Sequence, residues 1–285
     1  MKRLVIGYIF FNRKLGKDEK FFIKEAKKKK IDLILINLEE EIDEKKILEK
    51  IKYCDIIYNN SAEQFAIEIV KTIEELGKKV IDSSKTYYYT EDKWMFYLKC
   101  KESGIPTPET SLLSENINEI EKELLIFNHF PVILKRIEGT CGEYVEKANT
   151  PKQAIKIIKK FWKKGSERLP IIAQEFIKSP SYRVTVIGGK IVQTAIKKNK
   201  GSWKSTGVYE KKFQKFKVDK ELKKIINKVI RVMKINVCGI DLLKKDNQWK
   251  VLEINSTPGL DFFKNEREML VGKILDLLKK KAKRK

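Results

Sequence analysis

Short apolar runs alternate with longer amphipathic stretches in the N-terminal third of the chain. The amphipathic stretches have helical spacing, and the last of them ends at Gly77, a residue suited to a helix C-terminus. Strands that alternate with helices favour a parallel, doubly wound sheet, so we expect an α/β domain over residues 1–88. The expected strands are 4–11, 31–38, 55–59 and 79–82, and the expected helices are 17–30, 44–53 and 62–76.

Beyond residue 88 the pattern changes to helices mixed with hairpins, which predicts α+β structure. Residues 89–170 form one expected unit, with helices at 91–103, 116–126 and 151–164 and strands at 131–135 and 144–148. Residues 171–285 form a second unit, in which Gly188-Gly189 is the expected turn of a hairpin. Its expected strands are 171–177, 182–187, 190–197, 238–243 and 249–255, and its expected helices are 219–234 and a last one from about 265.

The composition of the 285 residues narrows the class of protein. No apolar run is long enough to span a bilayer, and the basic, apolar start at Met1–Gly7 fits a first strand better than a signal peptide. We therefore expect a cytoplasmic protein without a membrane partner. Four scattered cysteines and the single His129 argue against a zinc site, a disulfide framework and a Ser-His-Asp triad.

The net charge of +23 suggests anionic partners. Lysines nevertheless occur along almost every expected helix, and Lys, Glu and Ile enrichment is typical of thermophilic proteins. General lysine enrichment therefore explains the charge better than a dedicated nucleic-acid surface does, and we consider a nucleic-acid partner unlikely.

Three oxygen-bearing side chains converge on the last expected hairpin. Glu253 and Asn255 point to the same side of one strand, and Asp241 can face them from the other. Carboxylate and amide oxygens without nitrogen or sulfur suit Mg²⁺ or Mn²⁺. A polar, exposed sheet face is the alternative interpretation of the same pattern.

Two further segments have the residues of a phosphate site. Lys135 ends an apolar strand shortly before the loop Gly139-Thr140-Cys141-Gly142, whose glycines would let backbone N–H groups approach phosphates. This is not a Walker A sequence, and an ordinary hairpin turn would look similar. Arg183 lies inside a strand and is either an anion clamp or half of an edge salt bridge.

These residues occur in an order that resembles the ATP-grasp superfamily, and most of all the RimK-like amino-acid ligases. The resemblance runs from about residue 85 to the end and is most specific in KRIEGTCG and EINSTPGL. It implies a Rossmann-like N-terminal domain (1–88) followed by a two-lobed ATP-grasp fold, with a central lobe (89–170) and a C-terminal lobe (171–285).

The resemblance also implies a role for each matching residue. ATP would be bound by Lys93, Lys135, Gly139, Thr140, Gly142, by the adenine hinge Gln174, Glu175, Phe176 and Ile177, and by Ser181 near the ribose, where the family usually has an acidic residue. The expected catalytic residues are Arg183 and Lys204, the latter where the family often has arginine. The expected ligands of two Mg²⁺ (or Mn²⁺) ions are Asp241, Glu253 and Asn255.

The implied activity is ATP-dependent amide formation between a substrate carboxylate and an amino acid, with glutamate as the expected amine. An acyl phosphate would be the intermediate, and ADP and phosphate the by-products. The substrates would be a small-molecule, peptide or protein carboxylate plus the amino acid, and a homo-oligomer is possible in this family. Two alternatives stay open: a degenerate ATP-grasp module that only binds nucleotide, and a basic RNA-binding protein.

Overall fold

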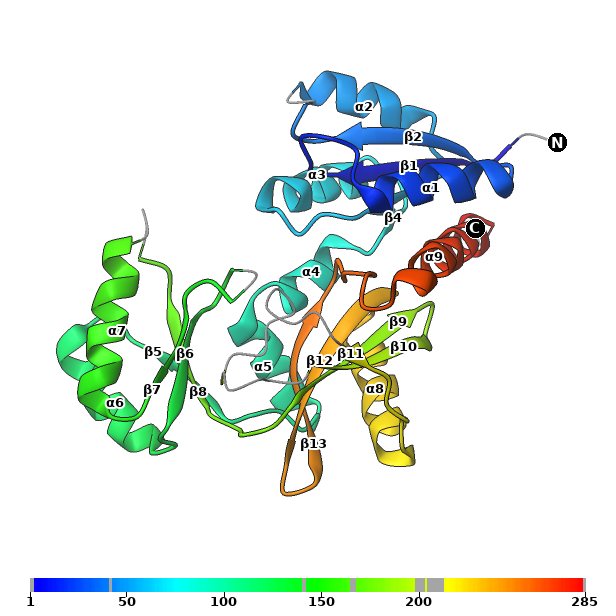
Figure 1. Ribbon diagram of the computed structural model, residues 1–285. Helices are drawn as coiled ribbons and strands as arrows, with labels where there is room; N and C mark the ends of the chain where they lie inside the picture. Colours follow the sequence, from blue (N-terminus) through cyan, green and yellow to red (C-terminus); the bar gives the residue numbers. More distant parts are fainter. Residues whose placement is uncertain are drawn as a thin grey trace.

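The computed structural model describes residues 3–40, 43–139, 142–164, 168–197, 203 and 213–283. Three sheets make up the fold, one in each third of the chain. Figure 1 shows the N-terminal part above, the green central lobe to one side, and the C-terminal sheet below the N-terminal part. The predicted mixed α/β fold, with two further lobes after the N-terminal part, is thus confirmed.

The N-terminal part is a parallel sheet of order β2-β1-β3-β4, with β1 (Val5–Phe10) and β3 (Ile56–Asn59) at its centre. Apolar side chains alternate between its faces, so each face has its own core. One core includes residues of α2 and α3, and the other includes residues of α1. The remaining elements are α1 (Lys17–Lys28), β2 (Asp32–Asn37), α2 (Glu44–Lys52), α3 (Gln64–Glu75) and β4 (Val80–Ile81).

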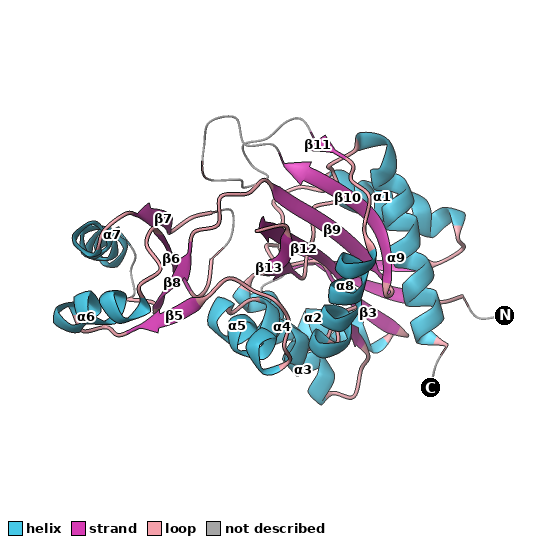
Figure 2. Cartoon of the chain, turned by 90° about the horizontal axis from the view of Figure 1, so that it is seen from below, coloured by secondary structure: helices cyan, strands magenta, loops and turns pink. Residues whose placement is uncertain are grey.

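The C-terminal helix α9 (Arg267–Ala282) packs beside α1 on this first sheet, although we expected residues 171–285 to form a lobe of their own. Leu270, Val271 and Leu275 of α9 are buried against Tyr8 and Phe22 in one core. Helix α9 and the N-terminal sheet therefore share one hydrophobic core, and Figures 1 and 2 show α9 beside α1.

The central lobe is an antiparallel sheet of order β5-β8-β6-β7, covered on one face by two helices (Figure 2). Its elements are β5 (Thr110–Leu113), α6 (Ile117–Phe127), β6 (Val132–Arg136), β7 (Val145–Ala148), α7 (Pro151–Lys164) and β8 (Ile171–Glu175). Strand β8 pairs with β5 and β6, so it extends this sheet, whereas we had assigned residues 171–175 to the C-terminal lobe. The predicted domain boundaries themselves stay a prediction.

The C-terminal sheet has the order β11-β10-β9-β12-β13. One face packs on α8 and α5, where Val184, Ile240 and Ile254 are buried. The side chains that alternate with these along the strands therefore lie on the other face of the sheet. The elements are β9 (Ser181–Ile187), β10 (Lys190–Lys197), β11 (Phe213–Gln214), α8 (Lys220–Met233), β12 (Val237–Lys245), β13 (Gln248–Asn255) and a 3₁₀ turn (Lys264–Glu266). Helices α4 (Ser84–Thr90) and α5 (Lys93–Glu102) connect the N-terminal part to the lobes.

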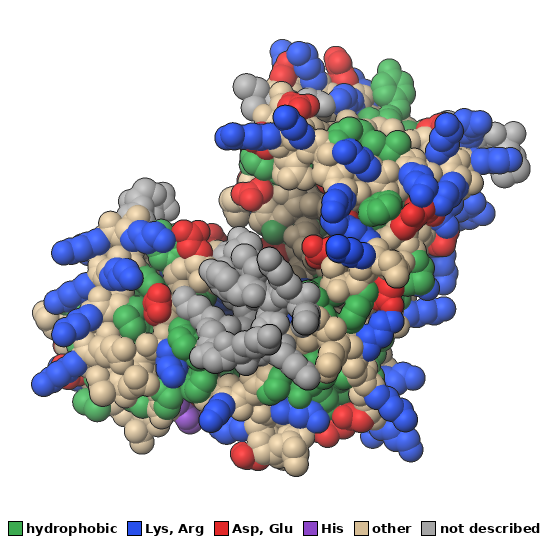
Figure 3. Space-filling view, viewed as in Figure 1, with side chains coloured by type: hydrophobic (Ala, Val, Ile, Leu, Met, Phe, Trp, Pro, Cys, Tyr) green, Lys and Arg blue, Asp and Glu red, His purple; other side chains and the backbone are tan. Residues whose placement is uncertain are grey.

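Most predicted elements are confirmed to within a few residues, and His129 lies in a loop as expected. Helix α4 and the short strands β5 and β11 were not predicted. Within the described ranges, no helix is long and apolar enough to cross a membrane. Lys and Arg side chains occur on all three parts of the face shown in Figure 3, which also shows a hollow between the N-terminal part and the central lobe.

Candidate active site

Arg183, Asp241 and Glu253 lie side by side across three strands. Asp241 is directly opposite Arg183 on β9 and opposite Glu253 on β13, and Ala195 completes this row on β10. We call these four residues the Arg183 row. Because their neighbours Val184, Ile240 and Ile254 face α8, the row faces the other way. The predicted convergence of Asp241 and Glu253 on one sheet face is confirmed.

The Asp241 carboxylate contacts two positively charged side chains. Arg183 makes a two-pronged contact, with Nε 2.6 Å from Oδ1 and Nη2 2.8 Å from Oδ2, and Lys197 Nζ lies 3.3 Å from Oδ1. Only 4% of Asp241 is exposed. Burial acts to raise the pKa of this carboxyl, but the charges of Arg183 and Lys197 outweigh it and hold the pKa below its ordinary value. The ion pairs with Arg183 and Lys197 therefore favour the ionised form of Asp241.

Gly239 makes room for the Arg183 guanidinium. A Cβ atom at residue 239 would lie 2.0 Å from Nη1 of Arg183, so any side chain there would displace it. The ring of Phe262 lies 5.7 Å from the guanidinium carbon and 5.8 Å from Lys197 Nζ. The Phe262 ring thus lies within cation–π distance of both Arg183 and Lys197.

Lys135 of the central lobe interacts electrostatically with Glu253 and Asp241. Lys135 and Gln174 lie on the sheet face opposite to the α6 and α7 core, and Lys135 Nζ donates to Gln174 Oε1 at 2.9 Å. Burial lowers the pKa of Lys135; the nearby Lys93 lowers it further, while Glu253 and Asp241 raise it. The charges of both lobes therefore act on one another across the gap between the two sheets.

Lys93 begins α5 and is tied to the loop after β6. Asp92 caps the helix by accepting from the backbone N–H groups of Trp94 and Met95. The Lys93 ammonium donates to the backbone oxygen of Gly139 at 2.9 Å. Gly139 and Gly142 both have positive φ, at 126° and 72°, which favours glycine at these loop positions. Thr140, a predicted ATP contact between them, lies outside the described residues.

The predicted adenine hinge joins the two lobes. The Phe176 N–H donates to the Pro131 carbonyl, whereas the Ile177 N–H has no acceptor among the residues that the structure describes. Glu175 accepts from the Glu109 N–H at 3.1 Å and from Lys245 Nζ at 2.5 Å. An unpaired N–H at residue 177 is suited to a purine edge.

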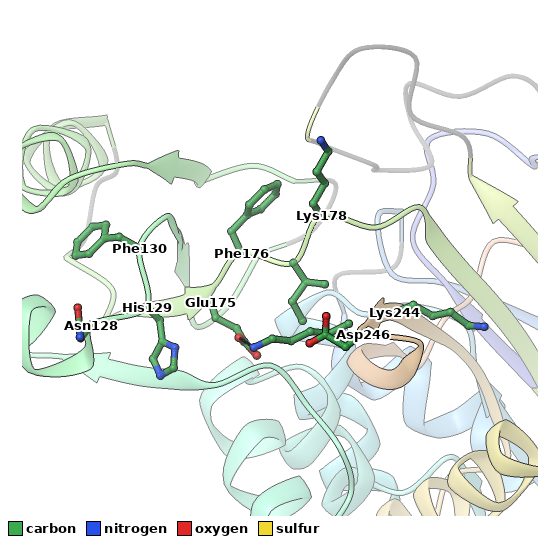
Figure 4. Close-up of a pocket in the computed structure, with 10 residues that line it drawn as sticks. Asn128, His129, Phe130, Glu175, Phe176, Lys178, Lys244 and Asp246 are labelled. Atoms are coloured by element: carbon green, nitrogen blue, oxygen red, sulfur yellow. Dashed lines mark hydrogen bonds and ion pairs between the residues drawn. The ribbon is translucent and has the colours of Figure 1, made fainter.

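A cavity of about 450 Å³ lies beside this hinge (Figure 4). Its lining comes from the loop before β6, from the hinge, and from the end of β12 with the turn that follows it. None of Lys135, Arg183 and Asp241 lines this cavity, so the cavity is separate from the charged group, by which we mean Arg183, Lys197 and Asp241. The lining residues are Asn128, His129, Phe130, Glu175, Phe176, Ile177, Lys178, Lys244, Lys245 and Asp246.

The remaining predicted site residues have mixed positions. Ser181 is buried at the start of β9, opposite Lys197, and Asn255 Nδ2 lies 3.4 Å from Asp241 Oδ2. Lys204 lies outside the described residues, so its predicted catalytic role stays a prediction. Among the described lysines, Lys197 is the one that contacts Asp241.

Glu91 is a further carboxylate of the site that sequence analysis missed. It accepts from the hydroxyl of Ser256 at 2.5 Å, and burial raises its pKa above the ordinary value. Its charge interacts with Lys93 and Glu253. The one feature of the sequence that could have indicated this role is the position of Glu91 just before Asp92 and Lys93.

The donor set fits a hard divalent cation. Glu253 makes no hydrogen bond to another described residue, and Asn255 turns its amide nitrogen to Asp241, which leaves Oδ1 for a ligand. Among the described residues no three His, Cys, Asp or Glu side chains form a metal site by themselves. Two carboxylates and one amide would therefore need phosphate oxygens to complete the coordination, as is usual for Mg²⁺.

Comparisons with known proteins agree with this arrangement. A family model described as a RimK-like ATP-grasp domain matches residues 90–278. A probable alpha-L-glutamate ligase of Legionella pneumophila (strain Corby) is 28% identical over 224 residues, which cover 77% of this chain and 73% of that protein. A probable alpha-L-glutamate ligase of Coxiella burnetii (strain Dugway 5J108-111) is 29% identical with the same coverage.

Two solved structures show the same fold. A RimK domain ATP-grasp protein from Sphaerobacter thermophilus superposes with a TM-score of 0.75 at 14% identity, over 97% of this chain and 99% of that one. D-alanine–D-alanine ligase from Bacillus anthracis, solved with ATP, has a TM-score of 0.72 at 19% identity, over 98% and 97%.

Proposed function

The chain belongs to the RimK-like ATP-grasp family of carboxylate–amine ligases, and from this premise we propose that it joins L-glutamate to a substrate carboxylate through an acyl phosphate. The observation that carries the proposal is the cluster of Arg183, Lys197 and Asp241 on the face of the C-terminal sheet that also carries Glu253, because it gathers cations and carboxylates where a triphosphate would end. The names of the relatives support glutamate as the amine.

Each residue has a role in ATP binding under this proposal. Lys93 and Lys135 neutralise phosphate oxygens, and the Gly139 and Gly142 loop closes over them. The hinge at Glu175–Ile177 receives the adenine. Asp241, Glu253 and Asn255 would hold Mg²⁺, which supplies charge neutralisation for the transferred phosphoryl group when it is bound.

The reaction then needs positioning and charge stabilisation more than acid–base chemistry. A substrate carboxylate oxygen attacks the γ-phosphorus, the bond from phosphorus to the β,γ-bridging oxygen breaks, and ADP leaves. Arg183 and Lys197 stabilise the transferred phosphoryl group and the tetrahedral adduct that forms when the amine attacks. For this step Arg183 must release part of its contact with Asp241, since its guanidinium contacts both carboxylate oxygens.

The test is a screen for ADP release, in which candidate acids are combined with each amino acid and products are identified by mass spectrometry. We expect ADP, phosphate and an amide heavier than the acid by one glutamyl residue. Nucleotide binding without turnover across the whole panel would instead favour a module that only binds ATP.

A further inference from the structure

A second row of side chains lies next to the Arg183 row on the same sheet face. Gln193, Thr185, Gly239 and Asn255 are direct cross-strand neighbours, and each is two residues from a member of the Arg183 row. We call them the Thr185 row. The next pair along the sheet, Ile187 and Val237, already belongs to the core shared with α9. The Thr185 row therefore lies between the charged group and that apolar core.

Two polar atoms of this row are buried without partners. Thr185 is 0% exposed and Gln193 is 4% exposed, and neither Thr185 Oγ1 nor Gln193 Oε1 has a hydrogen-bond partner in the described part of the chain. The orientation of Gln193 is fixed because its Nε2 donates to Glu266 Oε2 at 2.8 Å. Valine at 185 would have the same shape without an unpaired hydroxyl, so these atoms indicate a site for a ligand.

The Thr185 row lies at the reacting end of the proposed ATP site. Along β12, Lys245 contacts the hinge residue Glu175, Asp241 belongs to the charged group, and Gly239 is two residues further toward the N-terminal part. ATP with its base at the hinge and its phosphates at Asp241 directs its γ-phosphate toward the Thr185 row. The acyl phosphate and its attacking amine would meet at this end.

The chemistry of the two atoms selects the ligand group. Gln193 Oε1 can only accept a hydrogen bond and the Thr185 hydroxyl can also accept, so together they suit N–H donors and disfavour a carboxylate or phosphate. Both atoms are uncharged acceptors, so the pair can bind the N–H groups of an amine through hydrogen bonds alone. Only the neutral amine has a lone pair for attack.

We propose that Thr185 and Gln193 bind the primary amine of the second substrate and present it to the acyl phosphate. The inference rests on the proposed function. The amine nitrogen forms the C–N bond, the bond from the acyl carbon to the phosphate oxygen breaks, and phosphate leaves with the proton that the amine loses. Thr185 and Gln193 are positioning residues in this step and exchange no proton.

The test is calorimetric titration of L-glutamate into the full-length protein saturated with ADP and Mg²⁺. We expect Thr185→Val and Gln193→Leu each to raise the Kd for glutamate at least tenfold and to leave the Kd for ADP unchanged. Thr194→Val is the matched control, because its hydroxyl hydrogen-bonds to Phe216 on the opposite sheet face. In steady-state assays the same two variants should raise the KM for glutamate and leave the KM for ATP unchanged.

Equal glutamate affinity in the wild type and both variants overturns the inference. If the wild type binds ADP but no glutamate, the inference about Thr185 and Gln193 is also overturned, whereas the proposed nucleotide site still stands. A wild type that binds neither contradicts the proposed function itself. Thr185→Val is isosteric, so it keeps the experiment decisive even if Gln193→Leu unfolds.

Discussion

The Arg183 guanidinium lies over Gly239, in the space that a side chain at residue 239 would fill. The Gly239→Ala variant should lose at least about tenfold in ligase kcat, because the new methyl group displaces the guanidinium from the position in which it would stabilise the transferred phosphoryl group. Turnover and melting temperature measured together test this. Cys238→Ala, a change at the neighbouring residue that faces α8, is the control. Unchanged turnover in Gly239→Ala would show that the position of Arg183 does not matter.

Lys135 should contribute directly to ATP affinity. Lys135→Met removes a buried charge that faces the opposite lobe, and the loss of about 1.5–3 kcal/mol corresponds to a roughly 10- to 150-fold higher Kd for ATP. Calorimetric titration with a non-hydrolysable ATP analogue measures it. Lys156→Met, on the exposed surface of α7, should leave affinity unchanged. Equal affinity in the two variants would remove Lys135 from the phosphate site.

Glu253 should set the magnesium requirement. Glu253→Gln keeps the shape of the side chain and removes one anionic oxygen, so the Mg²⁺ concentration for half-maximal activity should rise about tenfold or more. A magnesium titration of ADP release checks it, with the exposed Glu221→Gln on α8 as the control. An identical magnesium curve would exclude Glu253 as a ligand.

Asp82 should make the fold less stable as the pH rises. This buried carboxyl accepts from Asn236 and from the Val237 N–H, and burial raises its pKa from 3.8 to about 6 although these hydrogen bonds lower it. The folded state therefore binds the proton more tightly than the unfolded state does. The contribution is fully present below pH 4 and is lost as the pH rises to about 6, for a total on the order of 3 kcal/mol.

Urea unfolding between pH 4 and pH 7 measures this effect. Asp82→Asn should flatten the fall in the free energy of unfolding over that range, whereas Asp246→Asn in the β12–β13 turn should leave it unchanged. A parallel pH dependence in wild type and Asp82→Asn would contradict the assignment.

The sequence predicted the elements with a strong apolar pattern and the residues at their ends. Strands β12 and β13 are rich in apolar residues and are joined by a short turn, so a hairpin with Asp241 and Glu253 on the same face could be predicted from alternation and from their closeness in the chain. Helix α4 was missed because its tyrosines and threonines have no helical apolar period, and β5 because four residues at a sheet edge have little signal.

The missed relationships depend on long-range register. Arg183 and Asp241 are 58 residues apart and meet only because β9 pairs with β12, so the two roles predicted for them did not reveal their contact. Thr185 and Gln193 look like ordinary polar strand residues until the pairing of β9 with β10 places both on the site face. The packing of α9 on the first sheet likewise depends on a core that joins distant segments.

The central claim is the formation of an acyl phosphate, and oxygen transfer tests it most directly. An acceptor acid labelled with ¹⁸O in its carboxylate is converted to amide with ATP and L-glutamate, and the phosphate released is examined by mass spectrometry. The account predicts one ¹⁸O atom in each phosphate, because the carboxylate oxygen that attacks phosphorus leaves with it. Unlabelled phosphate, with all label retained in the amide or lost to water, would contradict the mechanism.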